Sequence, residues 1–285
     1  MVQQLQLEKY FVPEPSTYPI FGSIALLLLG GGAAMWVNHV GAGPLTVAAG
    51  FAVLIYMLFG WFGKVVRESE GGKYGKRVDL SFRWGMGWFI FSEVMFFAAF
   101  FGALFYVRVI GLPMLSNPDN QLLWPNFAAA WPSTMAPGGI EPFTPMHAWG
   151  IPALNTLILL TSGATITWAH WGLLKNHRAH LKLGLFLTVA LGVLFLGFQI
   201  YEYVHSYLDL NLKLSSGIYG STFYMLTGFH GLHVTLGTIM LIVILFRVMA
   251  GHFRPENHFG FEAVAWYWHF VDVVWLGLFV TVYWL

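Results

Sequence analysis

Long apolar runs, separated by short polar or proline-rich segments, cover the chain from Tyr18 to Leu285. A helix needs about 20 predominantly apolar residues to cross the hydrocarbon core of a bilayer. Seven runs meet this requirement, near residues 18–38, 45–65, 80–109, 147–173, 181–207, 219–249 and 262–285. The pattern therefore predicts an all-α membrane protein with seven transmembrane helices.

The connections between these helices differ in length and polarity. A tight turn at residues 40–44 joins the first two helices, and a basic segment at 64–83 follows them. Residues 111–146 are rich in Pro, Asn and Gly, so we expect an external loop there that is ordered or partly helical. We treat the chain as one membrane domain over residues 1–285, with helices 1–2 near 18–65 and helices 3–7 near 80–285.

Composition agrees with this prediction. The chain is 57% hydrophobic and only 9% charged, whereas soluble domains carry about 25% charged residues. A net charge of +1 gives no basic surface for nucleic acid, which we exclude as a partner. The absence of cysteine excludes disulfides, iron–sulfur clusters and thiolate metal sites.

The distribution of Lys and Arg predicts the orientation in the membrane. If the N-terminus lies inside, the inner segments hold 12 of the 14 basic residues, and only Arg108 and Lys213 lie outside. Cytoplasmic loops of membrane proteins carry such an excess of Lys and Arg. We therefore expect the N-terminus in the cytoplasm and the C-terminus outside.

Glu93 is the first candidate functional residue, because it lies in the middle of an apolar run at residues 84–106. Ionisable groups at this depth are expensive and usually face a protein interior. His230, His233 and Asp272 fall at a similar depth, so each is a possible polar partner. Glu93 is either a functional acid or a protonated side chain that hydrogen-bonds to a neighbouring helix. The sequence does not say which contact exists.

The two histidines at 230 and 233 are three residues apart and therefore share a helix face. This spacing is compatible with a metal pair, a haem ligand, a proton relay, or two hydrogen-bonded histidines in a helix interface. A metal site needs further ligands and supporting groups around them. Nothing in the sequence requires these, so the four possibilities stay open at this point.

Four sequence blocks resemble subunit III of cytochrome c oxidase, in the haem–copper respiratory oxidase family. They are SEVMFF at 92–97; YGSTFY and TGFHGLHV between 219 and 234; HFGFE and WYWHFVDVVW between 258 and 275; and LNT, SG and TWAH between 154 and 170. The resemblance extends from about residue 18 to 285.

This resemblance implies a two-helix plus five-helix bundle with a lipid-filled cleft. It implies that the chain holds no haem or copper and has no metal ligand and no catalytic residue. Haem and copper are expected in the catalytic subunit I and the other oxidase subunits beside it. The family's midmembrane acid corresponds to Glu93. Phospholipid head groups are expected near Trp61, Arg67, Glu68 and Arg247.

The function implied is that of an accessory, non-redox subunit of a proton-pumping cytochrome c oxidase in a bacterial plasma membrane. It would brace the catalytic subunit, hold structural lipid, keep an apolar route for oxygen open, and help proton uptake near His177, His180 and Asp79. The family's mitochondrial members have two histidine pairs where this chain has His170-Trp171 and Asn257-His258. Alternatives are subunit III of a related quinol oxidase, a stand-alone proton-coupled transporter, and a membrane cytochrome with His230 or His233 as axial ligand.

Overall fold

The computed structural model describes residues 10–123, 127–133 and 141–285. Over this part of the chain the structure is helical and contains no strand. Seven helices are long and apolar enough to cross a membrane, which confirms the predicted fold class. The elements are α1 (Tyr18–Val37), α2 (Gly43–Glu70), α3 (Lys76–Tyr106), η1 (Val107–Gly111), α4 (Leu112–Leu115), α5 (Pro118–Gln121), α6 (Ile151–Leu174), α7 (Arg178–Leu208), α8 (Gly217–Met249), α9 (Phe259–Leu278) and η2 (Phe279–Trp284).

The third span is longer than its apolar run. A π-helical turn, η1, continues α3 directly into α4, so the helical path runs from Lys76 to Leu115. The loop predicted from residue 111 therefore begins as helix, and the short helix α5 follows it. The last span is likewise extended by a π-helical turn, η2, to Trp284.

The chain divides into two compact units, Met1–Phe82 and Arg83–Leu285, with the division inside α3. In the first unit, α1 and α2 form a hairpin, and α2 has Pro44 in its first turn, a position suited to proline. Gly32 lies where the helices cross, because a Cβ there would be only 2.7 Å from the Val47 backbone nitrogen. Small residues permit such close approach of membrane helices.

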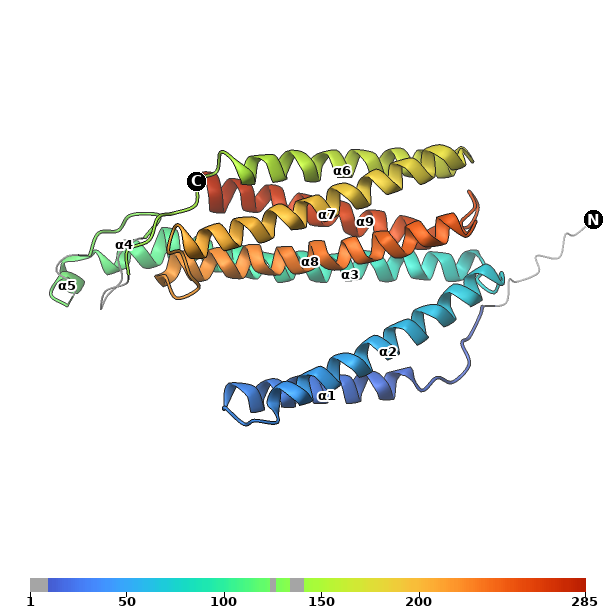
Figure 1. The fold of residues 1–285 in the computed structure, drawn as a ribbon, viewed down its shortest axis with the longest axis horizontal. Helices are drawn as coiled ribbons and strands as arrows, with labels where there is room; N and C mark the ends of the chain where they lie inside the picture. Colours follow the sequence, from blue (N-terminus) through green and yellow to red (C-terminus); the bar gives the residue numbers. More distant parts are fainter. Residues whose placement is uncertain (1–9, 124–126, 134–140) are drawn as a thin grey trace, which may run out of the picture. The chain divides into compact units, whose positions relative to one another are not determined.

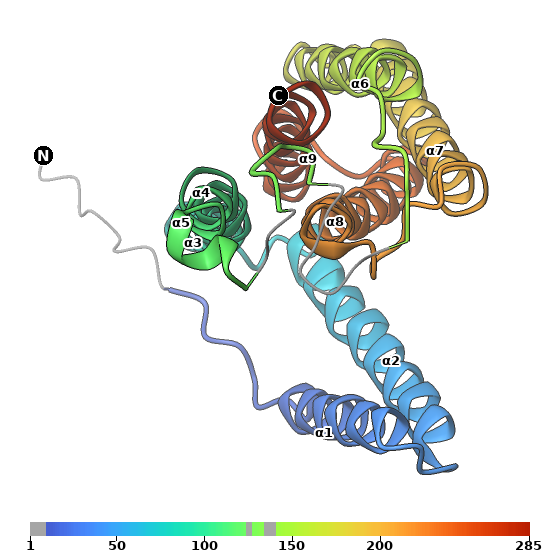
Figure 2. The ribbon, with the colours of Figure 1, turned by 90° about the vertical axis from the view of Figure 1, so that its left-hand side faces the viewer.

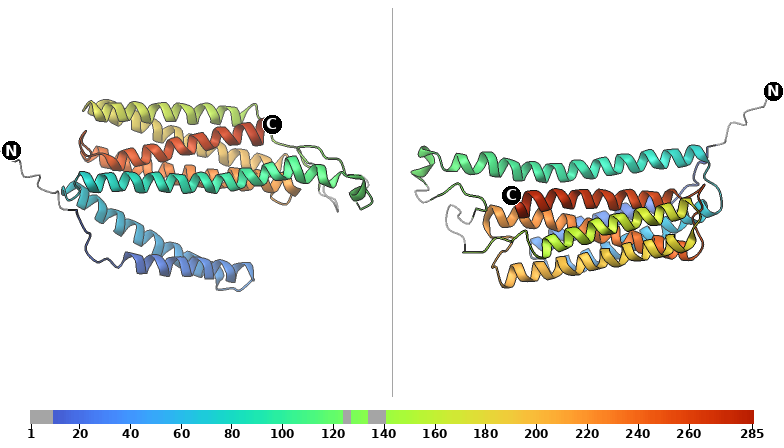
Figure 3. Two further views of the ribbon diagram at one scale, coloured as in Figure 1. Left: turned by 180° about the vertical axis from the view of Figure 1, so that it is seen from behind. Right: turned by 90° about the horizontal axis from the view of Figure 1, so that it is seen from above.

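In the second unit, α6, α7, α8 and α9 form a closed ring in which each helix packs against the next, and α9 packs against α6. The end-on view in Figure 2 shows this ring, with α3 beside it. The helix axes of this unit run along one common direction in Figure 1 and in both views of Figure 3. The predicted two-helix plus five-helix arrangement with its lipid-filled cleft stays a prediction.

Trp268 occupies the centre of the four-helix ring and is completely buried. Its indole nitrogen donates a hydrogen bond of 2.9 Å to Ser162 Oγ on α6. Its ring lies against Gly192 on α7 and Gly237 on α8, where a Cβ would approach ring atoms to 2.9 and 2.8 Å. One aromatic side chain on α9 thus contacts the other three helices of the ring.

Aromatic side chains attach α3 to this ring. Phe97 contacts Phe270 of α9 at a ring-centroid distance of 6.1 Å, and Phe96 contacts Phe229 of α8 at 5.1 Å. Arg83, near the other end of the helix, forms an ion pair of 2.5 Å with Glu262. These contacts fix which face of α3 is turned towards α8 and α9.

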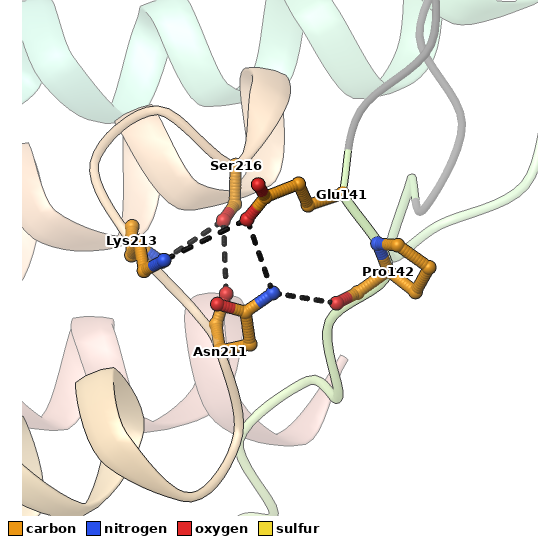
Figure 4. A network of polar contacts seen from close by, with 5 residues as sticks. All are labelled: Glu141, Pro142, Asn211, Lys213 and Ser216. Atoms are coloured by element: carbon orange, nitrogen blue, oxygen red, sulfur yellow. Dashed lines mark hydrogen bonds and ion pairs between the residues drawn. The ribbon is translucent and has the colours of Figure 1, made fainter.

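The α7–α8 connection is held to the segment that precedes α6 (Figure 4). Asn211 donates a hydrogen bond of 2.9 Å to the Pro142 carbonyl, and Lys213 Nζ lies 3.6 Å from Glu141 Oε2. The hydroxyl of Ser216 accepts a hydrogen bond from the Lys213 backbone nitrogen at 2.9 Å. These bonds order the polar end of the unit where α8 begins.

Candidate functional site in the membrane interior

The structure places Glu93 of α3 against His233 of α8. Glu93 Oε2 lies 2.9 Å from His233 Nε2, and the two side chains are 22% and 10% exposed. The imidazole lies among aromatic rings, with Phe97 at a centroid distance of 4.9 Å and Tyr267 at 6.4 Å. The acid is therefore neither free in hydrocarbon nor fully enclosed.

The hydrogen bonds restrict how protons are shared in this pair. His233 Nδ1 lies 2.6 Å from the Phe229 carbonyl oxygen, which can only accept, so Nδ1 carries a hydrogen. Nε2 then either accepts a hydrogen from a neutral Glu93 carboxyl or donates one to the carboxylate. Both arrangements are neutral overall, which reduces the cost of placing two ionisable groups inside the membrane.

His230 lies elsewhere, although it shares a helix with His233. It is 0% exposed and lies between Phe195 of α7 and Trp275 of α9, at centroid distances of 5.9 and 5.1 Å. Neither of its ring nitrogens has a hydrogen-bond partner among the described residues. His230 is thus enclosed in the interior of the four-helix ring.

Asp272 faces α6. A Cβ at Gly163 would lie 2.9 Å from Asp272 Oδ2, so the absence of a side chain at Gly163 leaves room for the carboxyl group. Its Oδ1 atom is buried and has no partner within the described part of the chain. Of the three residues expected near Glu93, the structure therefore gives a direct contact to His233 only.

A second buried acid, Glu202 of α7, was not included in the predicted site. It is 0% exposed, and its Oε1 accepts a hydrogen bond of 2.6 Å from the Tyr283 hydroxyl. Its other oxygen has no partner among the residues described. The only sequence signal was an acid in an apolar helix, and the partner lies 81 residues away.

Two of the four predicted lipid-contacting residues line one pocket in the first unit. This pocket has a volume of about 280 Å³ and is lined by Glu14, Lys64, Arg67, Glu68 and Lys73. It therefore gathers three cations and two carboxylates at the end of α2. Trp61, the third predicted residue, is 49% exposed and does not line the pocket.

Glu68 is fixed within this pocket by Tyr74. The Tyr74 hydroxyl donates a hydrogen bond of 2.8 Å to Glu68 Oε2. Burial, together with the neighbouring Glu68 carboxylate, raises the pKa of the Tyr74 phenol above its usual range. The phenol therefore stays a hydrogen-bond donor to the carboxylate well into alkaline solution.

Arg247, the fourth predicted lipid residue, lies near the end of α8 in the second unit. Its guanidinium carbon lies 4.2 Å from the centroid of the Phe253 ring, and its Nε donates to His252 Nδ1 at 3.4 Å. Stacking on an aromatic face orients the guanidinium group.

One further group of side chains has the composition of a metal site. Donor atoms of His170, His258 and Glu262 all lie within 4.8 Å of one another, where the end of α6 meets the start of α9. Among the described residues, this is the one cluster of three such ligands. His170 and His258 are far apart in the sequence, and no sequence pattern predicts that they meet.

Comparison with known proteins gives the family. The family model for cytochrome c oxidase subunit III matches residues 8–285. This chain belongs to the cytochrome c oxidase subunit III family. The match covers every helix described above and confirms the family expected from the sequence blocks.

Named relatives of this subunit III chain agree. Cytochrome c oxidase subunit 3 of Prototheca wickerhamii is 43% identical over 96% of this chain and 96% of its own length. The corresponding protein of Marchantia polymorpha is 43% identical over 98% and 97%. That of Dasypus novemcinctus is 41% identical over 98% of both chains. The chain is therefore a multi-pass membrane subunit of a haem–copper oxidase.

Proposed function

We propose that this chain is a non-redox subunit of a proton-pumping cytochrome c oxidase. In that complex it braces the catalytic haem–copper subunit I, holds structural phospholipid, and supports oxygen access and proton uptake. Haem and copper are carried by the partner subunits, and this chain supplies no catalytic residue.

The observation that carries this proposal is the contact between Glu93 and His233. It joins α3 to the four-helix ring in the middle of the spans, at 2.9 Å. His233 uses both ring nitrogens, one for Glu93 and one for the Phe229 carbonyl. His233, engaged in this way, connects two helices and keeps neither of its own ring nitrogens free for a haem.

Lipid binding is supported by the charges around the pocket of about 280 Å³ in the first unit. Lys64, Arg67 and Lys73 place three cations around it. Phospholipid phosphates at a membrane surface attract such basic groups. Trp61 and Arg247 are proposed as further lipid contacts, since each has a side chain of the kind that meets head groups at a helix end.

Oxygen access and proton uptake are proposed for different parts of the chain. Oxygen dissolves better in hydrocarbon than in water, and the exposed apolar side chains of α3, among them Phe91 and Met95, are suited to contact lipid. Proton uptake is assigned to the inner loops, where His177 and His180 lie with ring centroids 5.4 Å apart, and to Asp79.

We further propose that the chain resides in a bacterial plasma membrane, with its N-terminus in the cytoplasm and its C-terminus outside. The support is the excess of Lys and Arg in the segments assigned to the inner side. Cysteine labelling tests this orientation. A reactive cysteine introduced at His177 should react with a membrane-impermeant reagent only in inside-out vesicles. Reaction in intact spheroplasts would reverse the orientation.

The bracing role is tested by purifying the oxidase with and without this chain. We expect the chain to co-purify with the haem-containing subunit and to be colourless when separated from it. The oxidase without the chain should keep its haem and copper, while its oxygen consumption decays faster during continuous turnover. A Soret band from the isolated chain, or an unchanged turnover lifetime, would contradict the proposal.

Lipid binding is tested by counting phospholipids per haem with mass spectrometry. Arg67→Ala should lower this number, because it removes a cation from the pocket. Arg77→Ala is the matched control, since Arg77 is exposed in the same unit and does not line the pocket. Equal phospholipid counts in both variants would remove Arg67 from the lipid site.

A further inference from the structure

We propose that His170, His258 and Glu262 form a binding site for one zinc ion. The site lies outside the Glu93–His233 contact, on the polar ends of α6 and α9. It departs from the expectation, drawn from the sequence, that this chain ligates no metal. Zinc has no redox chemistry of its own, so the proposal is compatible with a non-redox subunit.

The geometry of the three side chains carries the proposal. One donor atom from each lies within 4.8 Å of the other two, and His258 Nε2 lies 3.7 Å from Glu262 Oε2. Two ligands of a tetrahedral zinc ion, with bonds of 2.0–2.2 Å, lie about 3.4 Å apart. Small side-chain rotations would therefore bring these donors to ligating distance.

The backbone holds these ligands in place. His258 immediately precedes α9 and Glu262 lies in its first helical turn, four residues later, so both lie on one side of this helix end. His170 reaches them from α6, and its ring lies 5.5 Å from that of His258. The ligands thus come from two helices that pack against each other in the ring.

An unsatisfied nitrogen atom favours an ion at this position. His170 Nε2 is buried and has no hydrogen-bond partner among the described residues. A buried polar atom without a partner is uncommon, and a bound ion or water is one of its ordinary explanations. Imidazole nitrogen is also a preferred zinc ligand.

Arg83 affects the site without closing it. Its guanidinium forms a 2.5 Å ion pair with Glu262 Oε2. A carboxylate has two oxygens with about four acceptor positions, so Glu262 can accept from arginine and still offer an acceptor position to a metal. Two imidazoles and one carboxylate leave a fourth tetrahedral position for water, as in zinc sites with three protein ligands.

The experiment uses the purified oxidase complex. It is stripped with a chelator, dialysed against zinc chloride, and its zinc content is measured per haem by mass spectrometry. His170→Gln and His258→Gln should each bind one zinc ion fewer per chain than the unmodified complex. His177→Gln is the matched control, because His177 is an exposed histidine just beyond the end of α6, and it should bind as much zinc as the unmodified complex.

Equal zinc contents in the unmodified complex, His170→Gln and His258→Gln would overturn the proposal. Subunit ratio and haem content show whether each variant assembles; if His258→Gln does not assemble, His170→Gln decides the result. Anomalous diffraction at the zinc absorption edge gives a second readout. A peak between the three side chains supports the site, and peaks only at other positions exclude it.

Discussion

Removing the Glu93 carboxyl tests how the α3–α8 contact works. In Glu93→Ala, His233 Nε2 loses its partner at 2.9 Å while Nδ1 stays bonded to the Phe229 carbonyl. In Glu93→Gln, the amide can donate a hydrogen to Nε2, so one neutral hydrogen bond replaces the original contact. The two variants therefore separate loss of a hydrogen bond from loss of a titratable group.

The size of the effect follows from the environment of Glu93 and His233. Leaving a buried polar group without its partner costs about 1–3 kcal/mol, whereas hydrogen bonds between membrane helices average about 0.6 kcal/mol and reach about 1.7 kcal/mol. His233 is 10% exposed and Glu93 22% exposed, so water can replace only part of the lost contact. We expect the α3–α8 contact to lose about 1–1.5 kcal/mol of stabilisation in Glu93→Ala and at most about 0.5 kcal/mol in Glu93→Gln.

The assay is the half-life of oxygen consumption by the purified oxidase during continuous turnover. If the contact breaks before the enzyme is inactivated, a loss of 1.4 kcal/mol of stabilisation corresponds to about a tenfold faster decay of oxygen consumption. We expect Glu93→Ala to shorten the half-life by about five- to tenfold with unchanged haem content, and Glu93→Gln to shorten it by less than about threefold.

A double-mutant cycle provides the control. His233→Phe keeps an aromatic ring against Phe97 and Tyr267 but removes both nitrogens. When it is combined with Glu93→Ala, the two effects should fall short of additivity by about 1 kcal/mol, because both remove the same contact. Full additivity, or a Glu93→Ala half-life equal to that of the unmodified oxidase, would refute the reasoning.

Two further predictions concern other parts of the chain. Gly237→Ala places a methyl group 2.8 Å from a Trp268 ring atom and should lower the free energy of unfolding by about 1–3 kcal/mol in a denaturation assay. Gly231→Ala, on the same helix with open space around it, is the control and should change the free energy of unfolding little. Equal effects of the two variants would contradict the packing account. Because the folded-state pKa of Tyr74 is raised, the stability it contributes is complete below the ordinary tyrosine pKa of about 10 and is lost as pH rises through the folded-state pKa. Glu68→Gln should shift the Tyr74 titration to lower pH, as followed by NMR of isotope-labelled tyrosine, and an unmoved titration would exclude the carboxylate as a cause.

The sequence determined the features that depend on local composition. A span is recognised from the number of consecutive apolar residues, so the seven helices could be read one at a time. The family could also be recognised, because blocks such as WYWHFVDVVW are contiguous in the chain. The acid at Glu93 was visible for the same reason: it interrupts an apolar run.

Only the tertiary structure decided which faces of these helices meet. Several spans are apolar all round, so hydropathy does not tell which side of a helix is buried. The sequence could place His230 and His233 on one face, yet packing turned His233 towards Glu93 and enclosed His230 beside Trp275. The cluster at the polar end required α6 and α9 to meet, 88 residues apart at His170 and His258. Contacts across helices depend on their rotation and pairing, which the packing of many side chains sets together.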